Sequence, residues 1–208
     1  SALVINIGTL SEEWVRSMFL AAEHATRRGI PIVLDPVGAG ATPYRTDTAR
    51  DLLNAAKPAI VRGNASEILA LAGRPTATKG VDSTAQSLEA LEAARELHVQ
   101  YGTALCISGE TDLIIGGGGL LKVRNGHPMM TRVTGLGCTA TALCGAFASV
   151  TQDPAQAAAQ AMAVMGIAGE MAAERSEGPG SLQMNFLDAL YRLTEADIAQ
   201  RLRLESGS

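Results

Sequence analysis

Short, uninterrupted apolar runs alternate along the chain with longer segments whose apolar residues recur at helical spacing. Runs rich in Val, Ile and Leu occupy residues 3–7, 32–34, 59–61 and 104–107. Helical patterns occupy residues 12–28, 46–56, 66–71 and 88–101. Continuous apolar runs are typical of parallel strands that are covered on both faces. The alternation therefore predicts βαβ units with right-handed crossovers, and hence a layered α/β fold with a mostly parallel sheet.

Residues 112–133 break this alternation. Apolar runs at 113–115 and 120–123 flank the glycines 116–119, and Asn125-Gly126 follows. Asn-Gly is the strongest two-residue hairpin signal, because both positions tolerate positive φ. We therefore expect a small antiparallel meander in this region. A phosphate-binding loop at the glycine run is the weaker interpretation, because no helix follows it.

From Gly137 onward the pattern is helical. The predicted helices are residues 138–150, 155–174, 182–191 and 195–203. Pro154 stands at the start of the second of these, and Gly178-Pro179-Gly180 separates two of them. The chain shows neither an internal repeat nor a linker, so we expect residues 1–208 to form a single domain with a substantial core.

Composition narrows the class of protein. Apolar residues make up 47% of the chain and charged residues 18%, a globular balance. Aromatic residues make up only 3% and the net charge is -4. Nucleic-acid binding, which needs basic stripes and stacking rings, is therefore excluded. The uncharged stretch 133–152 is long enough for a membrane span, but Gly, Thr and Ser dilute it, and we expect a buried helix there and no membrane partner.

The cysteines and the first residues bear on the compartment. Cys106, Cys138 and Cys144 are odd in number and form no CxxC pair, so a disulfide framework or zinc site is a poor interpretation. A reducing cytoplasm is the expectation. The chain opens on an apolar run with neither a basic leader nor a cleavage site, so we expect no signal peptide.

Small or polar residues follow directly after predicted strands, and in an open α/β sheet those strand ends lie on one edge, where ligands bind. Asp35 and a glycine turn follow the second strand. They can hold a metal near a phosphate, or form a turn in which Asp35 bonds its own backbone. After the third strand, Asn64 and Glu67 resemble a helix capping box, whereas Arg62 is placed for a bidentate phosphate contact.

Two further loops carry polar or glycine residues. Ser108 and two acids end the fourth strand, where they can bind nucleotide or start the hairpin. Gly135, Gly137 and Cys138 lead into a helix whose first N–H groups and positive dipole end form an anion hole. A thiolate is favoured in such a first turn. The alternative is a tight turn before a buried helix with an inert cysteine.

Together the four loops bring an acid, an Arg/Glu pair, a hydroxyl and an anion hole to one edge of the sheet. This combination indicates phosphoryl transfer from a nucleotide. The chain contains no GxxxxGK[ST] and no HRD or DFG, so it is neither a P-loop enzyme nor a protein kinase.

The sequences and the order of the loop motifs resemble those of hydroxyethylthiazole kinase, of the ribokinase-like superfamily. The motifs are ALVINIGTLS (2–11), DPVGAGAT (35–42), RGNASE (62–67), KGVDS (79–83), SGETD (108–112), NGH (125–127) and VTGLGC (133–138). The resemblance implies a three-layer α/β/α sandwich and ATP-dependent phosphorylation of 4-methyl-5-(2-hydroxyethyl)thiazole in thiamine biosynthesis and salvage. It also implies Mg²⁺ and a homotrimer with thiazole sites between subunits.

The resemblance assigns roles on the nucleotide side of the site. It implies that Arg62 and Ser108 contact ATP, with Ser108 standing where the family often has Thr. Asn64 is grouped with them as a nucleotide-binding residue. Asp35 and Glu67 are the implied ligands of Mg²⁺ and its waters.

On the acceptor side, the resemblance implies that Gly135, with Thr134, contacts the thiazole alcohol. Gly137 and Cys138 are the implied catalytic residues of the anion hole. Cys138 stands where ribokinase relatives carry an aspartate base. Because phosphoryl transfer follows a largely dissociative path that needs little base help, we expect Cys138 chiefly to position the alcohol.

The family's chains begin before Ala2 with a helix–strand–helix portion that supplies much of the thiazole pocket. We expect roughly 50–60 residues of that portion to be missing here, and the acceptor pocket to be incomplete. Alternatives are a hydroxymethylpyrimidine or pyridoxal-type kinase, a nucleotide-dependent hydrate dehydratase, or a truncated, non-catalytic nucleotide-binding form. The enzymatic rivals usually carry Asp where Cys138 stands.

Overall fold

The computed structural model describes residues 1–75 and 83–207, so that most of the KGVDS motif lies outside the described residues. A seven-stranded sheet with strand order β1-β2-β3-β4-β5-β6-β7 forms its centre. The strands are β1 Leu3–Asn6, β2 Ile32–Asp35, β3 Ile60–Asn64, β4 Ala104–Ser108, β5 Asp112–Gly116, β6 Gly119–Val123 and β7 Leu204–Gly207. The first four are parallel, and β5, β6 and β7 add antiparallel. The sheet is thus mostly parallel on its N-terminal side, as predicted.

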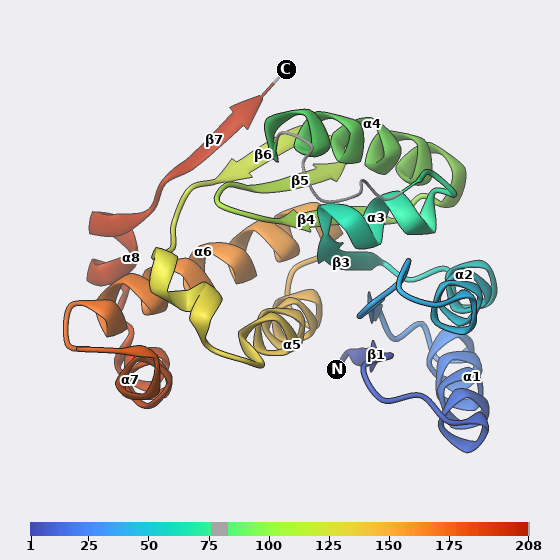
Figure 1. Ribbon diagram of the computed structural model, residues 1–208, viewed down its shortest axis with the longest axis horizontal. Helices are drawn as coiled ribbons and strands as arrows, with labels where there is room; N and C mark the ends of the chain where they lie inside the picture. The colour runs from blue at the N-terminus through green and yellow to red at the C-terminus, as the bar shows by residue number, and fades with distance from the viewer. Residues whose placement is uncertain (76–82, 208) are drawn as a thin grey trace.

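Helices cover both faces of the sheet (Figure 1). They are α1 Glu12–Arg27, α2 Pro43–Ala56, α3 Ala65–Leu71, α4 Ser83–Tyr101, the 3₁₀ helix η1 Pro128–Arg132, α5 Leu136–Ala148, α6 Pro154–Ala173, α7 Pro179–Arg192 and α8 Glu195–Arg201. Because β1 to β4 follow one another in spatial order, right-handed crossovers place α1 to α4 on one face. The opposite face is covered by α5 and α6, and α7 packs against α6. The result is the expected three-layer sandwich.

Two apolar cores lie on the two faces of the sheet, and successive strand residues alternate between them. Leu34, Val61 and Leu105 belong to the core beneath α1 to α4, and Val33, Ile60 and Cys106 to the core beneath α5 and α6. This alternation follows from the two-residue period of a strand. It explains why the strand sequences are continuously apolar.

The predicted meander is correct at one turn and wrong at the other. Gly116 pairs directly with Gly119, so the glycine run forms the hairpin turn between β5 and β6. Asn125-Gly126 forms no hairpin: the chain continues into η1, and β6 pairs instead with β7. The buried Asn125 amide bonds to main-chain groups of residues 201 and 203, and these tertiary bonds outweigh the local turn preference.

The C-terminal prediction also needs correction. The last helix was expected to reach Arg203 but ends at Arg201, and a seventh strand follows. α7 begins at Pro179, within the predicted break, since proline is favoured in the first turn of a helix. Within residues 1–75 and 83–207, the helices are all too short or too polar to cross a membrane.

Candidate functional site

The carboxyl ends of the parallel strands bring the predicted loops to one edge of the sheet. Asn6 at the end of β1 is in register with Asp35 at the end of β2. Asn64 at the end of β3 is likewise in register with Ser108 at the end of β4. The helix α5 starts at the same edge, because its first turn contacts Asn6 and Arg62. The four polar or glycine-containing loops after the strands are therefore neighbours, as predicted.

Asp35 is a buried carboxylate, 1% exposed, that two neutral side chains hold in place. Its Oδ2 accepts hydrogen bonds of 2.8 Å from Asn6 Nδ2 and from Thr141 Oγ1 of α5. Burial raises the pKa of Asp35 to about 6, although the Thr141 bond and the charge of Arg62 act in the opposite direction. A carboxyl group with this environment is typical of a functional site.

Cys138 lies exposed in the first turn of α5 and is joined to Asp35 through Asn6. The same Asn6 Nδ2 that bonds Asp35 donates to Cys138 Sγ at 3.3 Å. The other end of the amide, Oδ1, accepts from Gly8 N at 2.8 Å, which orients the side chain. Asn6 thus sets the position of Cys138 relative to Asp35.

The start of α5 has the form of an anion-binding site. Gly135 is its N-cap with φ +92, a left-handed conformation that favours glycine. Within the described part of the chain, no side chain caps this terminus, so its first N–H groups face outward. A Cβ at position 135 would meet nothing within 4 Å, which leaves space for a ligand beside the exposed Thr134.

Arg62 connects β3, β4 and α5. Its Nη2 donates to Ser108 Oγ at 2.8 Å, and its Nη1 donates to the carbonyl oxygen of Gly137 at 3.2 Å. Its Nε is buried and has no partner among the described residues. The guanidinium as a whole is half-buried, and Nη1 and Nη2 each keep a second N–H next to a helix N-terminus, an arrangement suited to a phosphate oxygen.

Asn64 and Glu67 form the capping box that the sequence predicted as one of two interpretations. Asn64 Oδ1 accepts from Glu67 N at 2.9 Å, and Glu67 Oε2 accepts from Asn64 N at 2.8 Å. Glu67 Oε1 also accepts from Gly38 N at 2.9 Å. Glu67 therefore joins the loop after β2 to the start of α3, and each of its oxygens keeps a lone pair for a further partner.

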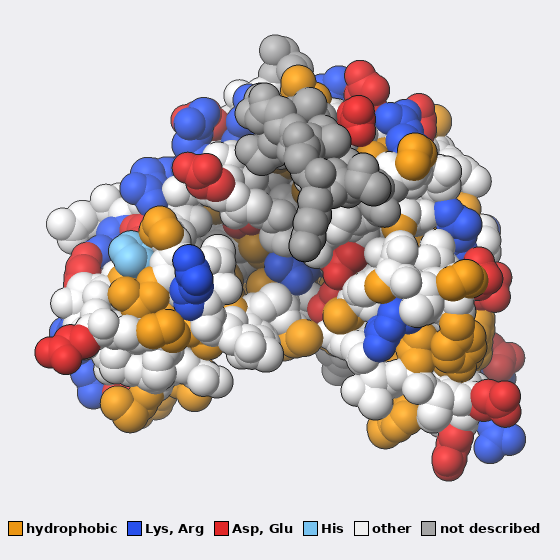
Figure 2. Space-filling view, in the orientation of Figure 1, with side chains coloured by type: hydrophobic (Ala, Val, Ile, Leu, Met, Phe, Trp, Pro, Cys, Tyr) orange, Lys and Arg blue, Asp and Glu red, His pale blue; other side chains and the backbone are white. Residues whose placement is uncertain are grey.

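A cavity of about 880 Å³ opens beside Arg62, between the β4–β5 turn, the segment after β6, and helices α5 and α6. Its polar lining includes Arg62, Ser108, Glu110, Asp112, Arg124 and Asn125, and its apolar lining includes Pro128, Met130, Leu136, Ala140, Met162 and Met165. Figure 2 shows this face of the molecule hollowed near its centre, with basic and acidic side chains inside the hollow. A cavity of this size accommodates a nucleotide.

Asp112 is a buried acid in this cavity. Its Oδ1 accepts from Gly109 N at 3.0 Å and closes the turn between β4 and β5. Burial raises the pKa of Asp112 to about 7, against the lowering effects of the Gly109 bond and the charge of Arg62. Of the two roles predicted for the acids after the fourth strand, nucleotide binding or the start of the hairpin, the bond to Gly109 N is the second.

A comparison with known proteins identifies the family. A model described as the hydroxyethylthiazole kinase family matches residues 1–196. The hydroxyethylthiazole kinase of Syntrophus aciditrophicus is 67% identical over 207 residues, which are 99% of this chain and 77% of that protein.

The chain belongs to the hydroxyethylthiazole kinase family.

Further relatives agree with this assignment. The hydroxyethylthiazole kinase of Nitratidesulfovibrio vulgaris is 53% identical over 98% of this chain and 76% of its own. The solved hydroxyethylthiazole kinase of Pyrococcus horikoshii superposes with a TM-score of 0.90 at 38% identity, over 100% of this chain and 77% of that one. The pyridoxal kinase of Staphylococcus aureus, at 18% identity and a TM-score of 0.63, shares the fold alone. The predicted family, ribokinase-like fold and phosphotransferase class are therefore confirmed.

In this member of the hydroxyethylthiazole kinase family, the sequence patterns did not predict that Asn6 and Thr141 contact Asp35. Asn6 carried a usable signal, because it is a polar residue at the end of an apolar strand, as Asp35 is. Thr141 carried none, since it lies inside an apolar helix and its contact to Asp35 spans 106 positions.

The hydroxyethylthiazole kinase family implies a divalent metal, and the acids at the sheet edge suit one. Glu67 is close enough to Asp35 to raise its pKa. Residues 1–75 and 83–207 contain no cluster of three or more acidic, His or Cys side chains that could enclose a metal by themselves. Mg²⁺ keeps several waters and takes one or two carboxylates together with substrate phosphates, so a pair of acids beside a phosphate site fits it.

Proposed function

We propose that this chain transfers the γ-phosphoryl group of ATP to the hydroxyl of 4-methyl-5-(2-hydroxyethyl)thiazole, in thiamine biosynthesis and salvage. The observation that carries the proposal is the position of Arg62, which bonds both Ser108 and the first turn of α5 inside the cavity. Membership of the hydroxyethylthiazole kinase family supports the choice of acceptor.

The two kinds of cavity lining suit the two ends of a nucleotide. Arg62, Ser108 and Gly137 would bind the phosphates, because they combine a guanidinium, a hydroxyl and main-chain N–H groups. Met130 and Met165 would contact the base, since thioethers pack well against aromatic rings. Asn64, at the end of β3, is proposed to face the same nucleotide.

Asp35 and Glu67 would hold Mg²⁺, directly or through its waters. The metal would neutralise charge on the transferring phosphoryl group. The raised pKa of Asp35 indicates that its negative charge lacks compensation in the protein alone, and a cation would provide it. Asn6 and Thr141 keep the carboxylate in one orientation through their bonds to Oδ2.

The acceptor would bind at the start of α5, where Gly135 leaves open space and Thr134 is exposed. The alcohol oxygen would form a bond to the γ-phosphorus as the bond to the ADP oxygen breaks, ADP would leave, and the alcohol proton would pass to solvent water. The N–H groups of the first turn, including that of Gly137, would stabilise the charge on the transferring group. Cys138 would position the alcohol, because a dissociative path needs little base strength.

We also propose that the chain is a single domain that acts as a cytoplasmic homotrimer. Large apolar side chains on α1 are exposed, among them Trp14 at 59% and Leu20 at 60%, and Figure 2 shows apolar side chains gathered over this helix. Such surface supports association between subunits. Light scattering coupled to size-exclusion chromatography tests the trimer.

A coupled ATPase assay with three acceptors tests the activity. We expect ADP release with hydroxyethylthiazole, and none with hydroxymethylpyrimidine or pyridoxal. Mass spectrometry of the product should show one added phosphoryl group. Turnover of pyridoxal or the pyrimidine alcohol in place of the thiazole would contradict the proposal. Nucleotide binding without transfer to any acceptor would identify the chain as a non-catalytic form.

A further inference from the structure

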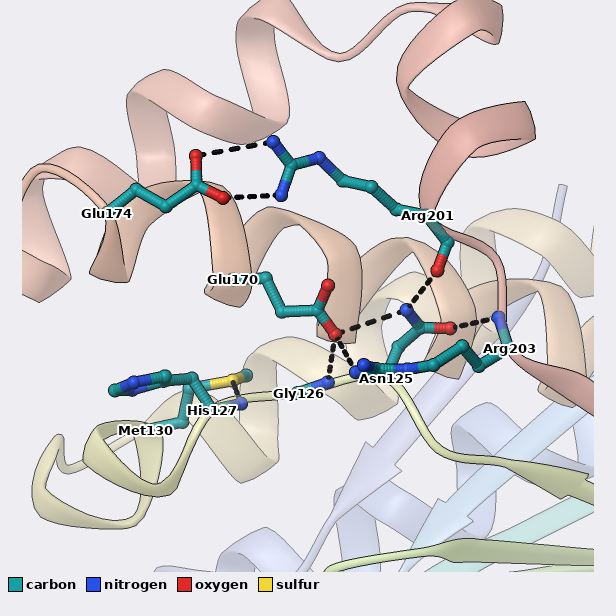
Figure 3. A network of polar contacts seen from close by, with 8 residues as sticks. All are labelled: Asn125, Gly126, His127, Met130, Glu170, Glu174, Arg201 and Arg203. Carbon is teal, nitrogen blue, oxygen red and sulfur yellow. Dashed lines mark hydrogen bonds and ion pairs between the residues drawn. The ribbon is translucent and has the colours of Figure 1, made fainter.

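Residues 125–130, which follow β6 and include the start of η1, form one wall of the cavity. Asn125, Gly126, His127, Pro128 and Met130 line it. Figure 3 shows the segment lying against α6 on one side, with the chain that links α8 to β7 beside it. The family match ends at residue 196, so this linking chain and β7 lie beyond it. The shape of the wall therefore depends on contacts that the strand–loop pattern did not predict.

Two glycines on α6 allow the wall to approach the helix closely. A Cβ at position 166 would lie 2.5 Å from the main-chain carbon of Asn125, and a Cβ at position 169 would overlap Met130 Sδ. Glycine in a helix interior costs ~1 kcal/mol relative to alanine, so a glycine here needs a packing reason. The close approach of the wall supplies that reason for Gly166 and Gly169.

Glu170, on the same face of α6, bonds the wall directly. Its Oε1 accepts from Gly126 N at 2.8 Å and from Asn125 Nδ2 at 3.1 Å, and it is ion-paired with Arg203 (Figure 3). The Glu170 side chain is only 16% exposed. A single carboxylate oxygen of α6 thus accepts two hydrogen bonds from the wall, and charge-assisted bonds of this kind are roughly twice as strong as neutral ones.

Asn125 extends the attachment to the C-terminal part of the chain. It is 5% exposed, and its Nδ2 also donates to the main-chain oxygen of Arg201 at 2.8 Å. Its Oδ1 accepts from the main-chain nitrogen of Arg203 at 2.8 Å. Both amide protons and the amide oxygen are thus used, which fixes the side chain and the backbone that carries it.

We propose that Glu170 is a positioning residue for the nucleotide, which holds the 125–130 wall of the cavity in place through Gly126 and Asn125. The inference rests on the proposed function, in which ATP occupies this cavity. Glu170 does not line the cavity itself, so it acts only through the wall. Its loss should therefore weaken nucleotide binding and leave the transfer step at saturating ATP unchanged.

Glu174, the more exposed C-cap residue of α6, is the control. It lies one turn after Glu170 and binds Arg201 through two contacts of 2.6 and 3.2 Å. Like Glu170, it pairs α6 with an arginine of the C-terminal part. In Figure 3 the dashed lines from Glu174 lead to Arg201, so its link to the wall is indirect, through the bond between the Arg201 main-chain oxygen and Asn125. Variants of Glu170 lose contacts to both the wall and the C-terminal segment, whereas variants of Glu174 lose contacts to the C-terminal segment. Comparison of the two therefore shows which effects come from the position of the wall.

The experiment compares Glu170→Ala, Glu170→Gln and Glu174→Ala with the wild type, using ADP binding by calorimetry together with KM for ATP and kcat. We expect Glu170→Ala to raise Kd for ADP and KM for ATP about tenfold, with kcat unchanged. Glu170→Gln should recover part of the loss, because its amide oxygen still accepts from Gly126 N. Glu174→Ala should leave all three constants unchanged.

Two results would overturn the inference: equal shifts of Kd in Glu170→Ala and Glu174→Ala, or a lower kcat in Glu170→Ala without a change in Kd. If Glu170→Ala does not fold, the pair Glu170→Gln and Glu174→Gln carries the same comparison. ADP binding is read without an acceptor. A wild type that binds ADP but phosphorylates no thiazole therefore contradicts the proposed function and leaves the test of Glu170 intact.

Discussion

Arg62 Nη2 donates a hydrogen bond of 2.8 Å to Ser108 Oγ, and this bond ties the end of β3 to the end of β4 inside the cavity. Because Nη1 of Arg62 bonds the carbonyl oxygen of Gly137, the guanidinium is held from two sides.

Replacement of Arg62 by alanine should raise KM for ATP roughly 10–100-fold, which corresponds to the loss of one charge-assisted hydrogen bond. Ser108→Ala should have a smaller effect of the same kind, because Arg62 keeps its bond to Gly137. Steady-state kinetics at varied ATP measure both. An Arg62→Ala variant with unchanged ATP dependence contradicts the assignment.

Asn6→Ala should lower kcat about tenfold without changing KM for ATP, because it removes the amide shared by Asp35 and Cys138. Cys138→Ser should retain most of the turnover, since the serine oxygen can accept the same bond from Asn6. Steady-state kinetics and ADP calorimetry report on both variants. Loss of turnover in Cys138→Ser with intact ADP binding would show that the thiol does more than position the alcohol.

Asp35→Asn should raise the Mg²⁺ concentration for half-maximal activity about tenfold, because the site loses one of its two proposed carboxylate ligands. The amide can still accept the hydrogen bond from Thr141, so the fold should persist. Activity is titrated with Mg²⁺ at fixed ATP, with Asp51→Asn on the exposed surface of α2 as control. Identical Mg²⁺ titrations for Asp35→Asn and the wild type would remove Asp35 from the metal site.

Asp112 should make the stability of the protein depend on pH. Burial raises its pKa from 3.8 to about 7, so the native state holds the proton more tightly than the unfolded state. The resulting stabilisation is complete below about pH 4 and is lost as pH rises through about 7. Asp112→Asn keeps an acceptor for Gly109 N and removes the titration.

The measurement is urea unfolding of the wild type and Asp112→Asn from pH 4 to pH 8. The free energy of unfolding of the wild type should fall relative to that of the variant by on the order of 2–4 kcal/mol across this range. Asp35 is present in both proteins, so its contribution cancels in the difference. If the free energies of unfolding of the wild type and Asp112→Asn changed with pH in parallel, the pKa of Asp112 would not be raised in the native state.

Gly166→Ala should destabilise the protein by roughly 1–3 kcal/mol, because the new methyl group meets the backbone of Asn125 and the wall must move. It should also weaken ADP binding, because the same wall lines the cavity. Gly180→Ala, in the first turn of α7 with nothing within 4 Å of its Cβ, serves as the control and should be neutral or stabilising. Thermal unfolding and calorimetry distinguish the two variants.

The parallel half of the fold was predictable because its signals are local. Apolar runs mark β1 to β4, and the polar residue after each run marks the edge of the sheet where the site lies. The Asn64–Glu67 capping box was visible for the same reason, since its two partners are three positions apart.

The remainder depends on contacts between distant residues. Asn125-Gly126 carries a strong hairpin signal, but the partners of the Asn125 side chain lie 45 to 78 positions away and draw the chain out of the sheet. The residues of β7 are mostly polar and exposed, and their sequence carries no strand pattern. They form a strand because they pair with β6.

The contact between Asn6 and Cys138 joins positions 132 residues apart and has a consequence for synthesis on the ribosome. The crossovers of β1 to β4 can assemble while the chain is still emerging, because each strand pairs with the one made just before it. The edge of the sheet that carries the proposed site cannot assemble at that stage, because α5 is translated only after the parallel strands are complete. A nascent chain can therefore pair β1 to β4 early, whereas the Asn6–Cys138 contact forms late, and a chain that stalls before Cys138 would lack the first turn of α5 at the proposed site.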